Sequence, residues 1–179
     1  MSDDGIGFRE MYEDRMDATE EAGGRQSEFT VADGSRVSIV LDRAETDGKI
    51  DVIEILMGPG GGPPPHRHPY GEWFRVLEGE LTMCEEQDGT IVVTTTLCPG
   101  DSVWVAPHTW HGTLNLSEEN AHYEVISVPG TMSGALREGG IRVSDLDTNH
   151  PPLEQMQHIA ARWGIEFWSG PTDLPPLAG

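Results

Sequence analysis

The sequence predicts an all-β fold, an antiparallel sandwich or barrel, with one amphipathic helix near the C-terminus. Apolar and polar residues alternate with period two from Ser27 to Val128, as in strands that bury one face. Gly, Asn and Asp interrupt this alternation at short, regular intervals, where tight reversals need them. A chain of 179 residues is the size of one ordinary domain with a single packed core.

The first segment, residues 1–25, differs from the rest in being rich in Asp and Glu. Its apolar residues Phe8, Met11, Tyr12 and Met16 recur at roughly helical spacing before the Gly-Gly pair at 23–24 ends the pattern. We therefore expect an acidic N-terminal arm or a short helix here.

The middle segment, residues 26–130, is expected to form the barrel. Its predicted strands cover residues 28–31, 36–41, 50–57, 73–77, 81–84, 91–97, 103–105, 112–116 and 123–128. Many short strands with turn residues between them are typical of antiparallel sandwiches and barrels.

The last segment, residues 131–179, is expected to hold a Gly-rich loop, a helix and a tail. The helix is predicted at residues 151–163, because Pro occupies its first turn and Gly164 follows its end. Leu153, Met156 and Ile159 share one face of this helix. We expect that face and the tail to pack against the barrel or a partner subunit.

The charge of the chain argues against two classes of partner. Eleven basic and 31 acidic residues give a net charge of −20, which repels nucleic acid and anionic lipid. No stretch has the length of a membrane span, and the N-terminus lacks the features of a signal peptide. The sequence therefore predicts a soluble, cytoplasmic protein that acts on a small molecule and binds neither nucleic acid nor membrane.

Three histidines and one carboxylate suggest a metal site. His66 and His68 share a face if the segment is extended, Glu72 continues on that inward face, and His111 follows far downstream. Neutral imidazoles with a carboxylate suit one divalent transition metal ion, and such a set leaves coordination positions open for a substrate. These ligands accept iron, manganese, nickel, cobalt, copper or zinc, so the identity of the metal stays open.

Two motifs around these residues resemble those of the cupin superfamily. The first is Gly60-x5-His66-x-His68-x3-Glu72-x6-Gly79, and the second places Gly100, His111 and Asn115 in register. Ala106 and His108 depart from the second motif, in which Pro and Gly are usual. The resemblance implies a cupin jelly-roll β-barrel with His66, His68, Glu72 and His111 as metal ligands at its open end. The single-cupin length and trailing helix also resemble bacterial quercetinase-like proteins.

Other residues are candidates for chemistry or for substrate binding. Glu72 and His108 could move protons, and the alternative interpretation of His108 is a loop residue that faces solvent. Tyr70 is expected near the mouth, where its phenol could bind substrate or simply form part of the rim. Phe74 and Val76 lie in register with Glu72 and are the predicted apolar walls of the pocket.

The leading functional hypothesis is a metal-dependent oxygenase that acts on an aromatic or phenolic small molecule. The alternatives are a metal-dependent polyketide cyclase or isomerase, which consumes no oxygen, and a small-molecule-binding cupin without catalysis. Exposed edge strands could pair with those of a second copy, so we also predict a homodimer, which light scattering would detect.

Overall fold

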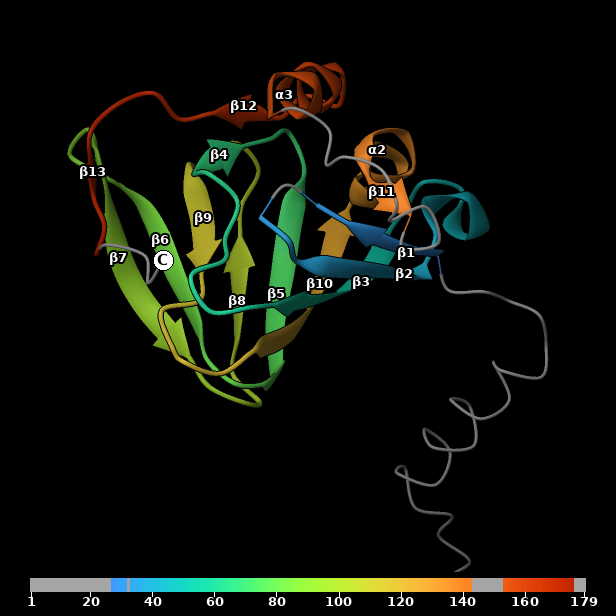
Figure 1. Cartoon of the computed structure of the whole chain (residues 1–179). Coiled ribbons are helices and arrows are strands. Elements are labelled where there is room, and N and C mark those ends of the chain that lie inside the picture. Colours follow the sequence, from blue (N-terminus) through green and yellow to red (C-terminus); the bar gives the residue numbers. More distant parts are fainter. Residues whose placement is uncertain (1–26, 32, 143–152, 176–179) are drawn as a thin grey trace, which may run out of the picture.

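The computed structural model describes residues 27–31, 33–142 and 153–175 (Figure 1). The predicted acidic arm or helix at residues 1–25 lies outside the described residues. Two sheets curve around a shared interior, so the all-β jelly-roll prediction is confirmed. The structure contains one chain, and the homodimer stays a prediction.

The described strands form two sheets, each with its own strand order. The first sheet has seven strands, β11 (Ile141–Arg142), β1 (Ser27–Thr30), β2 (Arg36–Leu41), β3 (Asp51–Met57), β10 (Ala121–Val128), β5 (Gly71–Glu78) and β8 (Ser102–Val105). The second has six strands, β12 (Glu166–Phe167), β4 (His66–Arg67), β9 (His111–Leu114), β6 (Leu81–Gln87), β7 (Thr90–Leu97) and β13 (Thr172–Asp173). Neighbouring strands are antiparallel except β13, which runs parallel to β7.

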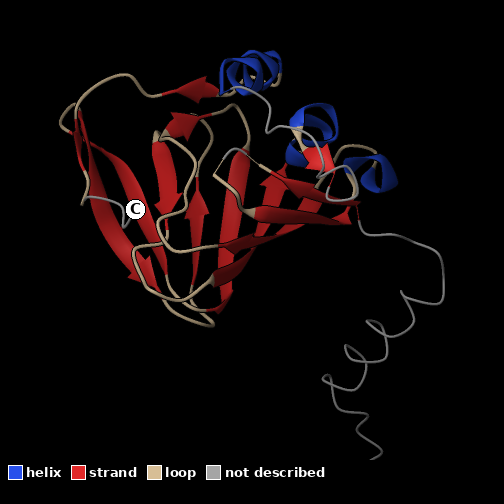
Figure 2. Cartoon of the chain, viewed as in Figure 1, coloured by secondary structure: helices blue, strands red, loops and turns tan. Residues whose placement is uncertain are grey.

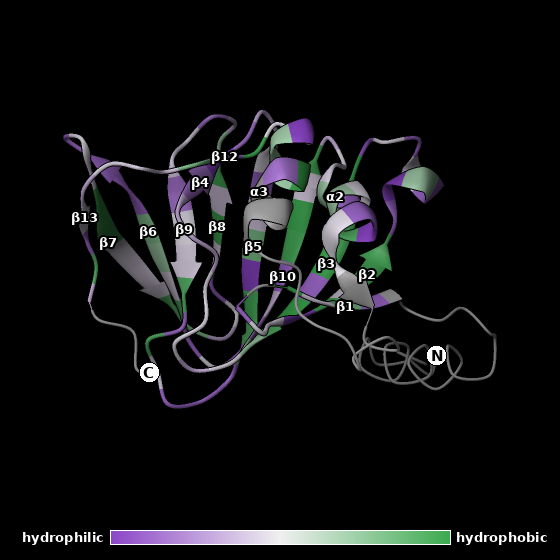
Figure 3. Cartoon of the chain, turned by 45° about the horizontal axis from the view of Figure 1, so that its top comes forward, coloured by the Kyte–Doolittle hydropathy of each residue, from purple (hydrophilic) through white to green (hydrophobic). Residues whose placement is uncertain are grey.

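The alternation seen in the sequence decides which side chains face the interior. Ile53, Ile55 and Met57 of β3 are buried, as are Tyr123 and Val125 of the neighbouring β10. Hydrophobic residues accordingly lie along β3 and β10, beneath the two helices (Figure 3). Burying one large aliphatic side chain is worth roughly 1.5–3 kcal/mol, so a slip of one residue would cost far more than local propensity could recover.

Among the described residues, two α-helices lie on one side of the sheets (Figure 2). They are α2 (Met132–Gly139) and α3 (Leu153–Arg162), and a 3₁₀ helix spans Arg43–Thr46. α3 agrees with the predicted C-terminal helix, whereas α2 forms where a Gly-rich loop was expected. Gly134 packs closely against the ring of Trp163, and Gly139 against Ile159. These glycines therefore let the segments of the two helices approach each other rather than breaking a helix.

The tail after α3 returns to the second sheet. β12 pairs with β4, and Arg67 binds Glu166 at 2.7 Å while its guanidinium lies 4.6 Å from the centre of the Trp110 ring. Trp110 also contacts Trp168 edge to face. The tail thus covers the strand that carries His66. In the part of the chain that the structure describes, no helix is both long and apolar enough to cross a membrane.

Candidate metal centre

Side chains from both sheets meet at one point of the barrel interior. β4 carries His66 and β9 carries His111, and these two residues are direct partners across the strands. His68 follows β4 by one residue, and Glu72 comes from β5 of the other sheet. The strand register therefore brings together residues that are up to 45 positions apart in the chain (66 to 111).

The three imidazoles are close enough to share one cation. The candidate ligand atoms of His66, His68 and His111 all lie within 4.8 Å of one another. The Glu72 Oε2 atom lies 3.1 Å from His68 Nε2 and 3.3 Å from His111 Nε2. His68, Glu72 and His111 are buried, with 1–3% of their surface exposed, and His66 is half-buried.

Backbone carbonyl groups orient all three rings in the same manner. The Nδ1 atom of His66 lies 2.9 Å from the carbonyl oxygen of Pro64, and that of His68 lies 2.8 Å from the oxygen of Tyr70. His111 Nδ1 lies 2.9 Å from the oxygen of Thr109. A carbonyl can only accept, so each Nδ1 carries the proton and a neutral ring presents its Nε2 lone pair.

The site consequently gathers acceptors that lack a donor. When the rings are neutral, three Nε2 lone pairs and one carboxylate oxygen converge, and a positive charge, carried by a proton or by a metal ion, satisfies them together. Burial, with the charge of His111 adding to it, lowers the pKa of His66 to about 4, so this imidazole is neutral near pH 7. Burial alone would raise the pKa of Glu72, but the imidazoles of His111 and His68, which donate to this carboxylate from Nε2 when they are protonated, hold its pKa below the usual range. A divalent cation bound by these four residues fits this donor set.

A sequence profile of the cupin domain matches residues 53–129, a range that includes all four of these residues. This chain contains a cupin domain. Germin-like protein subfamily 1 member 4 of Arabidopsis thaliana is 30% identical over 123 residues, 66% of this chain and 52% of the relative. The chain thus spans about half the length of that curated relative.

Solved structures also resemble part of this chain. The polyketide cyclase RemF from Streptomyces resistomycificus is 19% identical with a TM-score of 0.46, over 52% of this chain and 64% of that chain. A recombinant oxalate oxidase in complex with glycolate is 26% identical with a TM-score of 0.47, over 56% and 55% of the two chains.

Two aromatic residues support the imidazoles of the cupin domain. Tyr70 stacks on His68 with ring centres 3.8 Å apart and an interplanar angle of 6°. Only 2% of Tyr70 is exposed, so it lies deeper than the rim position expected for it. Phe74 meets His111 edge to face at 6.2 Å. Both rings restrict the rotation of a candidate ligand, which favours a preformed site.

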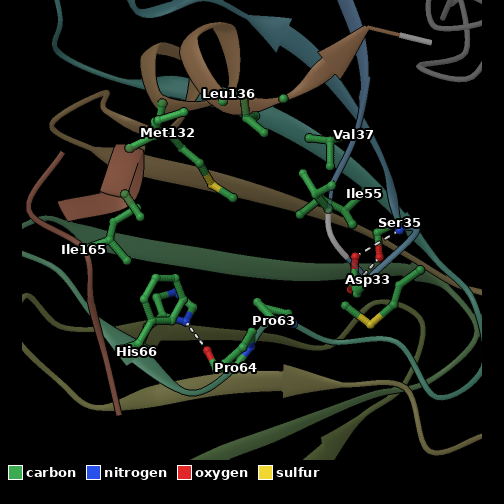
Figure 4. A pocket seen from close by; sticks show the side chains of 18 of the residues that line it. Asp33, Ser35, Val37, Ile55, Pro63, Pro64, His66, Met132, Leu136 and Ile165 are labelled. Atoms are coloured by element: carbon green, nitrogen blue, oxygen red, sulfur yellow. Dashed lines mark hydrogen bonds between the residues drawn. The ribbon is translucent and has the colours of Figure 1, made fainter. Parts of the chain in front are cut away.

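A cavity of about 210 Å³ opens beside His66 (Figure 4). Side chains from β2, β3 and β10 form its floor, and side chains from α2, α3 and the segment before β12 form its roof. Phe74 and Val76, the predicted walls, belong to the hydrophobic core and do not line this cavity. Sequence reasoning missed the roof residues Met132, Leu136 and Ile165, because only the tertiary arrangement places the helices over the barrel.

His108 occupies an exposed turn next to the site. Its φ of +65° is the left-handed conformation that favours glycine, and glycine is the residue usual at this position of the second motif. Its backbone N–H donates to the carbonyl oxygen of His68 at 2.7 Å. Its imidazole is not one of the three that converge. The proton-transfer role of His108 stays a prediction.

Asp51 is a second buried carboxylate, close enough to Glu72 for the two charges to interact. Its raised pKa leads to a prediction of how the free energy of unfolding depends on pH. Its Oδ2 accepts the backbone N–H of Ser133, in the first turn of α2, at 2.8 Å. Burial raises the pKa of Asp51 above its ordinary 3.8, and the charge of Glu72 adds to the rise. The folded state therefore binds this proton more tightly, so the contribution of Asp51 to stability falls as pH rises above 3.8 through the raised pKa.

We expect Asp51→Asn to flatten this fall and Asp51→Ala to lower the free energy of unfolding by about 1–3 kcal/mol, because alanine leaves the Ser133 N–H without an acceptor. Urea unfolding of metal-free protein from about pH 4 to about pH 8 measures both effects. Parallel stability curves for the wild type and Asp51→Asn would contradict the prediction.

Proposed function

We propose that this cupin domain binds one divalent transition metal ion through His66, His68, Glu72 and His111. We further propose that it acts as a metal-dependent oxygenase on an aromatic or phenolic small molecule. The convergence of four acceptor atoms beside an apolar cavity is the observation that carries this proposal. Such a geometry suits a substrate whose oxygen atoms reach the metal while its carbon skeleton lies in the cavity.

The metal, the imidazoles, Glu72 and the cavity would each have a separate role in the proposed reaction. A bound metal supplies Lewis-acid and redox chemistry to substrate oxygens. The Nδ1 bonds to Pro64, Tyr70 and Thr109 keep the imidazoles oriented without rearrangement. Glu72 is ionised at neutral pH and can accept a proton from a substrate hydroxyl group. The apolar cavity excludes water from the reacting groups.

A cyclase or isomerase is the second candidate, because the buried carboxylate of Glu72 could supply the base that such a reaction needs. A buried carboxylate beside a metal can remove a proton next to a carbonyl group without consuming oxygen. Oxygen dependence separates the two candidates.

Oxygen uptake tests the proposal directly. The protein would be loaded anaerobically with iron, manganese, nickel or cobalt and then assayed with catechols and flavonols. We expect oxygen uptake with at least one metal. Absence of uptake with every metal would overturn the oxygenase, and product formation without oxygen consumption would establish the second candidate instead.

Replacing Glu72 with glutamine separates proton transfer from metal binding. We expect Glu72→Gln to retain the metal on the three histidines while turnover falls by about 100-fold or more, the usual size of a general acid–base contribution. Metal analysis and turnover of the same samples provide the measurement. Glu54→Gln is the matched control, because Glu54 also contacts an imidazole, His122 at 3.4 Å, but lies on a different part of the sheet. Joint loss of metal and turnover in Glu72→Gln would instead make Glu72 mainly a ligand.

A further inference from the structure

The cavity beside His66 has a chemical character that narrows the substrate of the proposed enzyme. Its floor includes Val37 and Ile55 and its roof includes Leu136 and Ile159, all of them buried and apolar. Among the described residues that line it, none is Lys or Arg. A carboxylate on the substrate would therefore find no cationic side chain in the cavity, and burying an unpaired anion is costly.

The polar groups of the cavity lie at its two ends. His66 lies at one end, and Asp33 and Ser35 lie at the other (Figure 4). Asp33 already accepts three hydrogen bonds, from the N–H and hydroxyl groups of Ser35 at 3.0 and 2.9 Å and from the N–H of Gly62 at 2.9 Å. Because Asp33 is occupied in joining the β1–β2 turn to the loop before His66, the end at His66 is where a polar substrate group can bind.

The size of the cavity limits the apolar part of the substrate. An apolar protein cavity of about 150 Å³ holds one benzene ring, and the cavity here has about 210 Å³. The space suits one ring with a short alkyl group or a second fused ring. α2 and α3 cover one side of this space, and they pack closely where Gly139 lies against Ile159.

From these observations we infer that the substrate has two parts, a polar head that reaches the metal centre at His66 and an uncharged mono- or bicyclic body that fills the cavity beneath α2 and α3. The two helices then determine which bodies fit. Small hydrophilic acids such as oxalate gain nothing from this cavity. The inference rests on the proposed function, since it assigns the substrate class of that same site.

A series of 4-alkylcatechols tests the two-part substrate by binding alone. Titration calorimetry would use zinc-loaded protein, which does not turn the ligand over, with catechol, 4-methylcatechol, 4-ethylcatechol, 4-butylcatechol and oxalate. We expect affinity to rise by about fourfold for each buried methylene, the equivalent of about 0.8 kcal/mol. Equal affinities along the series, or tighter binding of oxalate than of 4-butylcatechol, would overturn the inference.

Substitutions on α3 locate the body of the ligand. Ala160 lines the cavity, whereas the adjacent Ala161 is exposed on another face of the helix. We expect Ala160→Phe to weaken 4-butylcatechol binding at least tenfold with little effect on catechol, and Ala161→Phe to leave both unchanged. Met132→Ala removes side-chain volume from the roof, so it enlarges the cavity and should shift the binding preference toward catechols with longer alkyl groups. This variant tests the assignment even if Ala160→Phe does not fold. Identical alkyl dependence in all three variants would contradict the assignment.

Binding of n-butylbenzene to metal-free protein separates this inference from the proposed function. The cavity requires no metal, so we expect n-butylbenzene to bind and Ala160→Phe to abolish that binding. If n-butylbenzene binds as expected but the oxygenase assay shows no oxygen uptake, only the proposed oxygenase reaction would be rejected. Absence of n-butylbenzene binding from a wild-type protein that takes up oxygen with catechol would reject only the apolar body.

Discussion

Replacing His111 with alanine is expected to abolish stoichiometric metal uptake. The substitution removes one of three convergent Nε2 atoms and one of two hydrogen-bond partners of Glu72. Loss of a partner that only orients a ligand typically weakens metal binding 10–100-fold, so loss of the ligand itself should weaken it by about 100-fold or more. Elemental analysis of untagged protein and calorimetric titration with zinc would measure stoichiometry and affinity.

Two further variants make this result interpretable. His111→Gln keeps much of the side-chain volume, and it should lose the metal as well if the imidazole is a ligand. His122→Gln is the control, because His122 lies outside the centre and contacts Glu54 at 3.4 Å. Metal uptake that survives in both His111 variants, or an absence of stoichiometric uptake by the wild type, would contradict the proposed centre.

The spacing of the motifs was sufficient to predict which residues converge, because strand geometry places i and i+2 on one face and the second motif supplied His111. The hydrogen bonds that orient the rings could not be predicted. They go to the carbonyl groups of Pro64, Tyr70 and Thr109, and the direction of a carbonyl depends on backbone angles rather than on residue type.

The misplaced expectations have a common physical origin. α2 was expected to be a loop because of its glycines, yet Gly134 and Gly139 allow close packing against Trp163 and Ile159. Phe74 and Val76 do face inward, as period two requires, but the interior at their level is filled by the core. Local pattern thus predicted strands and faces, while the position of the cavity depended on where the helices pack.

The loop before β4 offers the second prediction with a large effect. Gly62 has a φ of +150°, and a methyl group on it would overlap the carbonyl oxygen of Thr113 and lie 3.0 Å from Leu114. The backbone oxygen of a strand cannot move aside at low cost. Strained backbone and overpacking each cost about 1–3 kcal/mol, so we expect Gly62→Ala to lower the free energy of unfolding by about 3–5 kcal/mol.

Metal binding should weaken in the same variant. The Gly62 N–H donates to Asp33 at 2.9 Å, and His66 follows only four residues later in the chain. A shift of this loop therefore moves His66 away from His68 and His111. Urea unfolding of the metal-free protein and zinc titration of the folded fraction measure the two effects separately.

Gly89→Ala is the matched control for this prediction. Gly89 also has a positive φ, +81°, but a methyl group there meets no atom within 4 Å. It should cost only the left-handed backbone penalty of about 1–2 kcal/mol and leave zinc affinity unchanged. If Gly62→Ala behaved like Gly89→Ala in both measurements, close contact between this loop and β9 would not position His66. The order of the metal centre would then have to come from the carbonyl groups that orient its rings and from the packing of Tyr70.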